Sequence, residues 1–289
     1  MNPDLNEAVF LPQGQDGAFN ISEEFGKNRR VYIEAGLDYT KSVGLHNFGG
    51  LVLYNQSKYY SPNLLYNIPN GYQGIVGRVT YDYASRYMAE FNVGYNGTEN
   101  FDEGKRFGFF PAFSLGWVAS EESFFPKNNV VTYLKVRGSY GEVGNDKVGG
   151  RRFLYMPTPY LYQSGSSVNY NTLTPQYNLG EVGQNYVNYL LSYEGGMGNP
   201  DLTWERAKKS NIGVDMFVWN DKIKITADLF KETRKNILTD RETIPVIVGA
   251  RMPAYNLGEM ENGGFEGEIM FRDKVKDLNY WVKGIYSFA

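Results

Sequence analysis

Three successive segments between residues 78 and 142 share a strict period of two, and this repeat constrains the fold more than any other feature of the chain. In Tyr87–Tyr95 every second side chain is apolar or aromatic, and the side chains between them are polar, small or flexible. Segments 113–119 and 134–140 repeat the pattern. Such alternation predicts β-strands with one apolar and one polar face.

The connectors between these segments indicate the kind of sheet that they form. A water-soluble sheet would also place an apolar face on a core and a polar face in solvent. Here the connectors alternate between very short, as at Ala84–Arg86, and long, as at Gly97–Arg106. Transmembrane barrels have short turns at one end and long loops at the other. The sequence therefore favours an antiparallel transmembrane β-barrel.

The same period continues on both sides of this block and gives about ten strands in all. The further alternating segments are 31–40, 46–55, 75–83, 211–218, 223–231, 265–271 and the residues after Asp277. The register of 46–55 is ambiguous, because Leu51 and Leu53 fall on the opposite parity from Val52.

Long connectors are predicted at four places, and we expect them to face the outside of the cell while the short ones face the periplasm. These connectors are 55–72, 97–106, 143–203 and 232–255. We treat 1–289 as one barrel region, with 1–29 as a loop or strand remnant and 143–203 as a long extracellular loop. Residues 1–16 carry no secretion signal, and the chain stops inside an alternating segment, so we expect a part of a longer polypeptide.

Composition narrows the function classes. The chain has 24 Tyr, 33 Gly and 16% aromatic residues, which suits barrel walls and aromatic girdles. A net charge of -3 gives no basic footprint, so we expect no nucleic-acid partner. The absence of cysteine excludes disulfides, thiol catalysis and Cys-ligated metals. The chain has no run of about 18 apolar residues, so the sequence predicts no transmembrane helix.

Four aromatic residues lie at the short-turn ends of the predicted hairpins. They are Tyr83, Tyr87, Trp117 and Trp219. Aromatic rings gather where a membrane meets water, so we interpret the four as membrane-interface residues. The alternative is that aromatic residues simply favour strands.

The chain offers little material for catalysis. His46 is the only histidine, which leaves no basis for a His triad or a multi-His metal site. Glu121-Glu122 fits a capped turn after Ser120 better than a carboxylate pair, since adjacent residues seldom converge on one bond. Glu266 and Glu268 share the predicted lumen face, where a solvated wall accounts for them. We expect no enzyme, no cofactor and no metal.

Five segments, taken in order, carry a family resemblance. They read RFGFFPAFSLGWVASEESFF, LKVRGSYGEVGN, GNPDLTWE, NIGVDMFVWNDKIKITADLFKETRKNIL and LGEMENGGFEGEI. Each is unspecific alone, but the ordered set, from about Tyr39 to Ala289, resembles the SusC/RagA family of TonB-dependent outer-membrane transporters. The resemblance implies a barrel of about 22 strands filled by an amino-terminal plug. The signal sequence, the TonB-contacting segment and the plug have no counterpart in this chain.

Geometry distinguishes a complete small barrel from an arc of a large one. Ten strands would close at a radius of about 10 Å, against about 22 Å for 22 strands. Glycines on the predicted lumen face of several strands would leave room for a plug, although strand glycines also mark bulges and bends. They are Gly36, Gly94, Gly116 and Gly213. We therefore interpret the chain as an arc.

The resemblance implies import of a bulky nutrient, a glycan or an oligopeptide, across the outer membrane. It also implies a SusD-like surface lipoprotein, the TonB complex and outer-membrane lipid as partners. The alternatives are a passive porin or structural outer-membrane barrel, and a soluble all-β carbohydrate-binding module.

The longest predicted loop is rich in tyrosine, and its rings are candidate ligand contacts. Aromatic faces can pack on sugar rings or on peptide side chains, and they can equally pack the loop against itself or a partner. The candidates are Tyr155, Tyr160, Tyr162, Tyr170 and Tyr177. Nothing in the sequence separates a glycan from a peptide.

Overall fold

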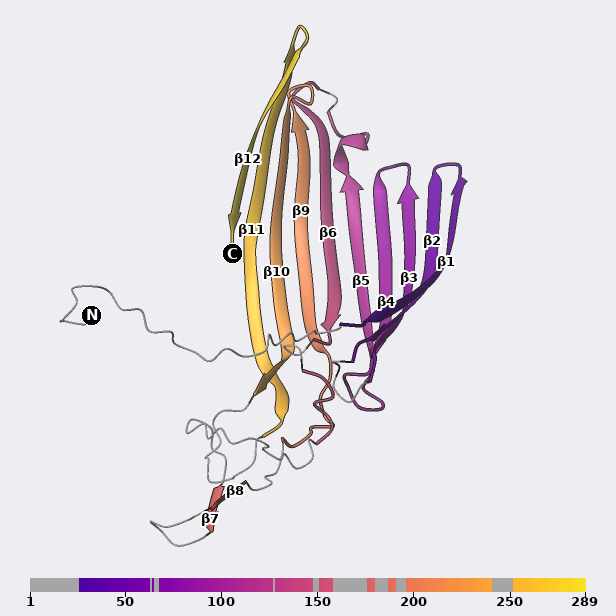
Figure 1. The fold of residues 1–289 in the computed structure, drawn as a ribbon. Helices are drawn as coiled ribbons and strands as arrows, with labels where there is room; N and C mark the ends of the chain where they lie inside the picture. Colours follow the sequence, from indigo (N-terminus) through magenta and orange to yellow (C-terminus); the bar gives the residue numbers. More distant parts are fainter. Residues whose placement is uncertain are drawn as a thin grey trace, which may run out of the picture.

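The computed structural model shows an all-β fold. It describes residues 26–62, 64, 68–126, 128–147, 151–157, 176–179, 187–190, 196–240 and 252–289. Ten strands form one antiparallel sheet in the order β1-β2-β3-β4-β5-β6-β9-β10-β11-β12, and β7 and β8 form a second, two-stranded sheet (Figure 1). The prediction of an all-β chain with about ten wall strands is confirmed.

The strands of the large sheet are β1 (Arg29–Val43), β2 (His46–Tyr60), β3 (Asn70–Tyr83), β4 (Tyr87–Thr98), β5 (Phe107–Val118), β6 (Val131–Asn145), β9 (Glu205–Val218), β10 (Ile223–Asp240), β11 (Ala254–Val275) and β12 (Leu278–Phe288). The small sheet consists of β7 (Gln176–Leu179) and β8 (Val187–Leu190). A 3-10 turn, η2 (Ala119–Glu121), follows β5. None of the described helices is long and apolar enough to cross a membrane.

The strand ends define two opposite edges of the large sheet, and these edges differ in the connections that they carry (Figure 1). The tight turns after β1, β3, β9 and β11 lie at one edge, together with η2, and we call this the short-turn edge. Strands β2, β4, β6 and β10 end at the opposite edge, the loop edge. Two residues of the β3–β4 turn, Ala84 and Ser85, have φ values of 53° and 55°. Positive φ at both central residues matches the twist of a tight hairpin.

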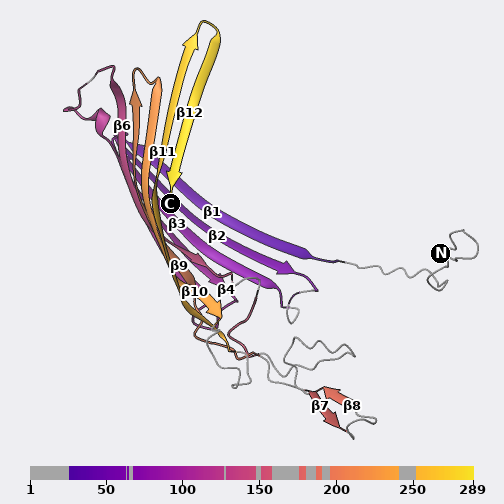
Figure 2. The same cartoon turned by 90° about the vertical axis from the view of Figure 1, so that its left-hand side faces the viewer.

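The large sheet is an open, curved arc (Figure 2). β1 pairs only with β2, and β12 pairs only with β11, so both outer strands have one unpaired edge within the described sheet. The sheet is a single layer with a concave and a convex face. This arrangement agrees with an arc of a barrel.

At the loop edge the strands are longer than the sequence pattern predicts. The expected connectors 55–72 and 232–255 begin inside strands, because β2 continues to Tyr60, β10 to Asp240, and β11 starts at Ala254. Those boundaries were wrong for a physical reason. The added residues are largely polar on both faces, so the apolar–polar contrast disappears although the backbone ladder continues.

The predicted segments 143–203 and 1–29 also gain defined bounds. β6 runs through Asn145, so the connection to β9 spans 146–204 and contains β7 and β8. Residues 1–25 lie outside the described residues, and Arg29 is the first residue of β1.

A small hydrophobic core lies at the loop edge rather than between layers. It consists of Phe101, Phe110, Leu202 and Trp204, each at most 7% exposed. The Trp204 ring packs 5.5 Å from Phe101 and 5.3 Å from Phe110, measured between ring centroids. Residues from the β4–β5 connection, from β5 and from the segment before β9 therefore hold the loop edge together.

Candidate functional site

Cross-strand pairing sorts the side chains of the sheet onto two faces with different chemistry. On β4, Asn92 lines a hollow on the concave face, while Phe91 is 47% exposed on the convex face. The convex face is apolar over its middle: Leu37 is 76% exposed and Leu229 63%. The two predicted faces of these strands are therefore present, with the polar one on the concave side.

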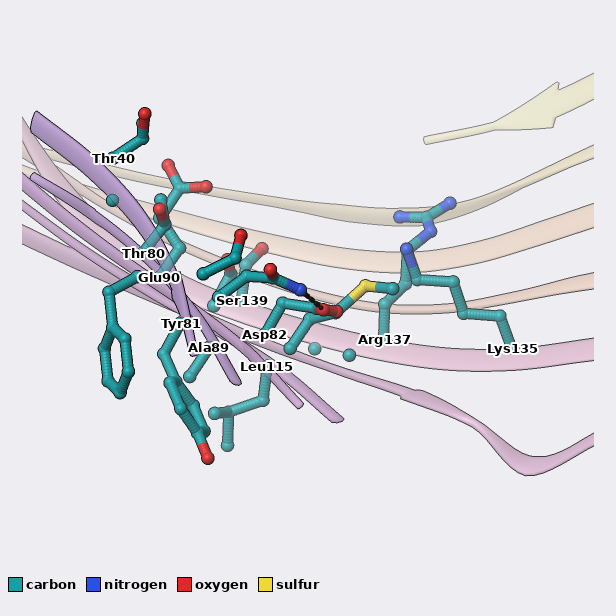
Figure 3. Close-up of a pocket in the computed structure, with 18 of the residues that line it drawn as sticks. Thr40, Thr80, Tyr81, Asp82, Ala89, Glu90, Leu115, Lys135, Arg137 and Ser139 are labelled. Carbon is teal, nitrogen blue, oxygen red and sulfur yellow. Dashed lines mark hydrogen bonds between the residues drawn. The ribbon is translucent and has the colours of Figure 1, made fainter. Parts of the chain in front are cut away.

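The main hollow of the concave face has a volume of about 700 Å³. Its lining side chains carry mostly hydroxyl, amide and charged groups: Thr40, Ser42, Asn47, Thr80, Asp82, Glu90, Ser114, Lys135, Arg137, Ser139 and Asn211. In Figure 3 Glu90, Ser139 and Arg137 extend to one side of the sheet, while Tyr81 and Leu115 extend to the other. The pairing also settles the register of β2, which the sequence left ambiguous. Leu51 lies with Asn47 on the concave face, and Val52 lies on the convex face.

Arg137 on β6 is the centre of the concave charge network. Its Nη2 donates to Asp228 at 2.7 Å and its Nε donates to Asp215 at 3.1 Å. Thr226 Oγ1 donates to Asp215 at 3.0 Å. The cluster joins β6, β9 and β10, and charge-assisted bonds of this kind fix the geometry of the wall.

Gly213 makes this cluster possible. A Cβ at Gly213 would lie 2.6 Å from Arg137 Cζ and 2.6 Å from Asp228 Oδ1. The space above Gly213 is therefore filled by Arg137 from the neighbouring strand. The same holds at Gly116, where the nearest atom is Lys135 Cε at 3.2 Å. Both of these lumen-face glycines therefore accommodate a side chain from the neighbouring strand.

Further ion pairs extend the charged wall across the sheet. Glu90 pairs with Arg78 at 2.9 Å, and Glu268 pairs with Lys283 at 2.6 Å. Arg234 bridges Glu205 and Glu232 at 2.9 and 2.8 Å. No group of three His, Asp or Glu side chains in the described part of the chain could hold a metal ion. The chemistry on offer is a wet, charged and hydrogen-bonding surface.

Hydrogen bonds tie three connections together at the loop edge. Arg152 donates to Glu99 at 2.9 Å and to the carbonyl oxygen of Ile68 at 2.8 Å. Lys105 pairs with Asp201 at 2.7 Å. The loop edge is therefore a cross-linked platform rather than a set of independent loops.

The sequence GNPDLTWE anchors that platform to β11. Asn199 Nδ2 donates to the carbonyl oxygen of Ala254 at 2.9 Å, and Asn256 Oδ1 accepts from the backbone of Thr203 at 2.9 Å. Leu202 and Trp204 fill the core beneath. The sequence analysis found this segment unspecific when taken alone. The signal it missed is two large apolar residues inside a polar loop.

The predicted ligand tyrosines are not brought together by the described structure. Tyr155 is half-buried, and its ring packs against that of Phe153 with centroids 6.2 Å apart. Tyr160, Tyr162 and Tyr170 lie outside the described residues. Tyr177 belongs to β7, of which only the backbone is described.

Three of the predicted interface aromatics, together with His46, form one cross-strand row on the convex face. His46 pairs with Tyr83, Tyr83 with Tyr87, and Tyr87 with Trp117. We call these four residues the aromatic row. It lies at the short-turn edge of β2 to β5, and the ring centroids of His46 and Tyr83 are 4.8 Å apart. The fourth predicted residue, Trp219, lies in the β9–β10 turn and is 61% exposed.

Glu122 is held against this row. Tyr87 Oη donates to its carboxylate, and Trp117 Nε1 donates to the same oxygen at 3.1 Å. The hydrogen bond from Tyr87, followed by that from Trp117, lowers the pKa of the Glu122 carboxyl below its ordinary value. Sequence reasoning assigned Glu122 to a capped turn and missed this role, because Tyr87 lies 35 residues away in the chain.

A comparison with protein families decides the identity of the fold. The family model described as "TonB dependent receptor-like, beta-barrel" matches residues 5–289. The chain belongs to the TonB-dependent receptor β-barrel family. Barrels of this family are outer-membrane receptors and transporters rather than enzymes.

Curated relatives agree with this assignment. TonB-dependent receptor P3 of Formosa agariphila is 27% identical over 284 residues, which cover 96% of this chain and 26% of that protein. TonB-dependent receptor SusC of Bacteroides thetaiotaomicron is 29% identical over 212 residues, which cover 71% of this chain and 19% of that protein. The resemblance to the SusC/RagA family is thereby confirmed. The chain spans about a quarter of the length of P3, the more fully covered of these two relatives.

Solved structures share the fold. The RagAB peptide importer in its open-open state has a TM-score of 0.64 at 18% identity, covering 90% of this chain and 30% of that chain. The siderophore receptor PirA from Pseudomonas aeruginosa has a TM-score of 0.53 at 11% identity, covering 91% of this chain and 44% of that chain.

Proposed function

We propose that this chain forms part of the wall of an outer-membrane transporter that imports a bulky nutrient, with energy supplied through TonB. The observation that carries the proposal is the two-faced sheet. Its convex face is apolar and open, as a lipid-facing surface must be, and its concave face carries a connected set of charged and amide groups. An exposed apolar face of this extent argues against a soluble carbohydrate-binding module.

In this proposal the described sheet is an arc of a barrel of about 22 strands, with the loop edge outside the cell and the short-turn edge in the periplasm. The cargo is a glycan or an oligopeptide, and a SusD-like surface lipoprotein docks at the loop edge. Support comes from the cross-linked platform there and from the match to SusC. The tyrosine-rich segment 155–177 belongs to the outer vestibule, where its rings contact cargo or partner.

The test is nutrient uptake by a strain in which the native gene is deleted and then restored. Complementation with the full-length gene should restore growth on the nutrient, and inactivating TonB should abolish that growth. Uptake that persists without TonB would instead indicate a passive porin. Growth that never depends on the gene would indicate a structural barrel.

A second variant tests the vestibule. Deleting residues 155–177 should lower uptake while the protein still assembles in the outer membrane, as judged by the heat-modifiable mobility of the barrel on gels. Unchanged uptake would remove this segment from the import mechanism.

A further inference from the structure

The aromatic row and Glu122 form a rim with exposed charge at the membrane-facing side of the short-turn edge. Tyr87 is 46% and Trp117 38% exposed, and Phe124 beside Trp117 is 69% exposed, with ring centroids 6.3 Å apart. An apolar ring so exposed in the connection between β5 and β6 is expected where the surface meets lipid rather than water. The rim therefore combines an apolar surface with the Glu122 carboxylate.

The Glu122 carboxylate keeps one oxygen available. Both Tyr87 and Trp117 donate to Oε1. Among the described residues no hydrogen bond reaches Oε2, and Glu122 forms no ion pair there. The two bonds hold the carboxylate in place and leave Oε2 as an acceptor for an external donor.

A cation accompanies this anion. Arg86, in the β3–β4 turn, directly precedes Tyr87, and its carbonyl oxygen accepts from the backbone N–H of Val118 at 2.8 Å, which places it beside the end of β5 that leads into η2 and Glu122. The charge of Arg86 also lowers the pKa of the Glu122 carboxyl. In the described part of the chain the Arg86 guanidinium has no acidic partner and no side-chain hydrogen bond of its own. An unpaired guanidinium and an unpaired carboxylate oxygen thus lie on one rim, close together but not bonded to each other.

We propose that this rim binds the headgroup of a phospholipid that carries a primary ammonium, with the ammonium on Glu122 Oε2 and the phosphate on Arg86. A primary ammonium offers three N–H donors, whereas the quaternary ammonium of choline offers none. Guanidinium groups match phosphate geometry well. An anionic headgroup without an ammonium would be repelled by Glu122. The aromatic row and Phe124 contact the glycerol and upper acyl chains.

This inference rests on the proposed membrane placement of the sheet, and its test is separate from the uptake assay. The full-length protein in detergent is mixed with equal amounts of dioleoyl phosphatidylethanolamine, phosphatidylcholine and phosphatidylglycerol, and native mass spectrometry counts each bound lipid. We expect phosphatidylethanolamine to be retained over both others. Glu122→Gln should lower its ratio to phosphatidylcholine by about two- to fivefold, the size expected for one exposed ion pair.

Two more variants complete the design. Arg86→Gln should reduce retention of all three lipids, since each contains a phosphate. Glu103→Gln removes an exposed carboxylate at the loop edge and should leave every ratio unchanged. Unfolded variants are recognised by loss of heat-modifiable mobility, and for a folded Glu122→Gln an unchanged ratio overturns the inference.

Equal retention of the three lipids by the wild type also overturns the inference, as does a preference for phosphatidylglycerol. These results leave the import proposal standing, because uptake is measured without them. Conversely, loss of TonB dependence sinks the import proposal while the lipid ratios stay interpretable.

Discussion

Arg137 shows how a single residue sets the polar face of the sheet. Its guanidinium contacts Asp215 on β9 and Asp228 on β10, and Gly213 supplies the room for it to cross between them. The two carboxylates lie on neighbouring strands, so the cation between them offsets their mutual repulsion. Asp228 is only 16% exposed in its side chain, which makes the pairing more than a surface ion pair.

Replacing Arg137 with Met should therefore destabilise the barrel by about 1–3 kcal/mol, because two partly buried carboxylates lose their partner. The measurement is the temperature at which the folded band converts to the unfolded band on a semi-native gel. Arg78→Met is the matched control, since it breaks a more exposed pair with Glu90, with side chains 49% and 31% exposed, and should cost under about 1 kcal/mol. Equal losses in the two variants would contradict the central role of Arg137.

The contribution of Glu122 to the stability of the folded protein should change with pH only under acidic conditions. The bonds from Tyr87 and Trp117 lower the folded-state pKa of Glu122, so its contribution to stability is present above the ordinary pKa of about 4.3 and is lost as pH falls through the lower folded value. The thermal midpoint of the wild type should therefore exceed that of Glu122→Gln by a constant amount above the ordinary pKa, and the gap should close as the pH falls below that value. A gap that persists at low pH would show that the charge of Glu122 is not involved.

At the scale of single strands, the convex face of β10 changes from apolar to charged along the length of the strand. On the convex face of β10, the apolar Leu229 is followed at the same parity by Lys231 and Lys235. Lys231 pairs with Glu261 at 3.4 Å, and Lys235 pairs with Glu259 at 3.3 Å. Charged pairs are costly against hydrocarbon, so in the proposed barrel this change marks where β10 and β11 leave the lipid. The strands continue beyond that point because the backbone hydrogen bonds between them do not require one apolar and one polar face.

The register of β4 can be tested by placing the same charge on either face. Phe91→Arg puts a cation on the convex face, where a charge near the bilayer centre costs about 2–4 kcal/mol, whereas Asn92→Arg points into the wet concave side. We expect Phe91→Arg to impair outer-membrane assembly clearly more than Asn92→Arg, measured as the heat-modifiable fraction in membranes. Similar assembly of the two variants would reject the assignment of faces.

At the scale of the whole molecule, the arc has a platform at one edge and turns at the other. The platform is cross-linked by Arg152, Lys105 and Asn199, whereas the opposite edge consists mainly of tight turns. The two edges are therefore built for different surroundings. Both outer strands, β1 and β12, present unpaired backbone groups, which lipid does not tolerate. In the proposed barrel, further strands pair with the free sides of β1 and β12.

Single cysteines can report which edge faces the outside of the cell. The chain itself has no cysteine, so Glu103→Cys at the loop edge and Asp277→Cys in the β11–β12 turn introduce unique thiols within it. On intact cells a membrane-impermeant thiol reagent should label Glu103→Cys, and Asp277→Cys only after the outer membrane is permeabilised. Labelling of Asp277→Cys alone on intact cells would invert the proposed orientation.

The sequence by itself determined the strand content, the approximate number of wall strands, the alternation of short and long connectors, and the family. These properties are local: side-chain period, turn residues and connector length are all contained in short stretches of chain. The same locality explains the misplaced strand ends at Tyr60 and Asp240, because polar residues on both faces hide a strand that only its neighbours reveal.

The tertiary structure alone decided which distant residues meet. Arg137 and Asp228 are 91 residues apart, and Trp204 donates to the carbonyl oxygen of Arg106 across 98 residues. Both contacts depend on the pairing of β6 with β9 across the long connection. A period of two fixes which face a side chain takes but not its partner on the next strand, and a slip of two residues would keep every face while breaking every one of these contacts.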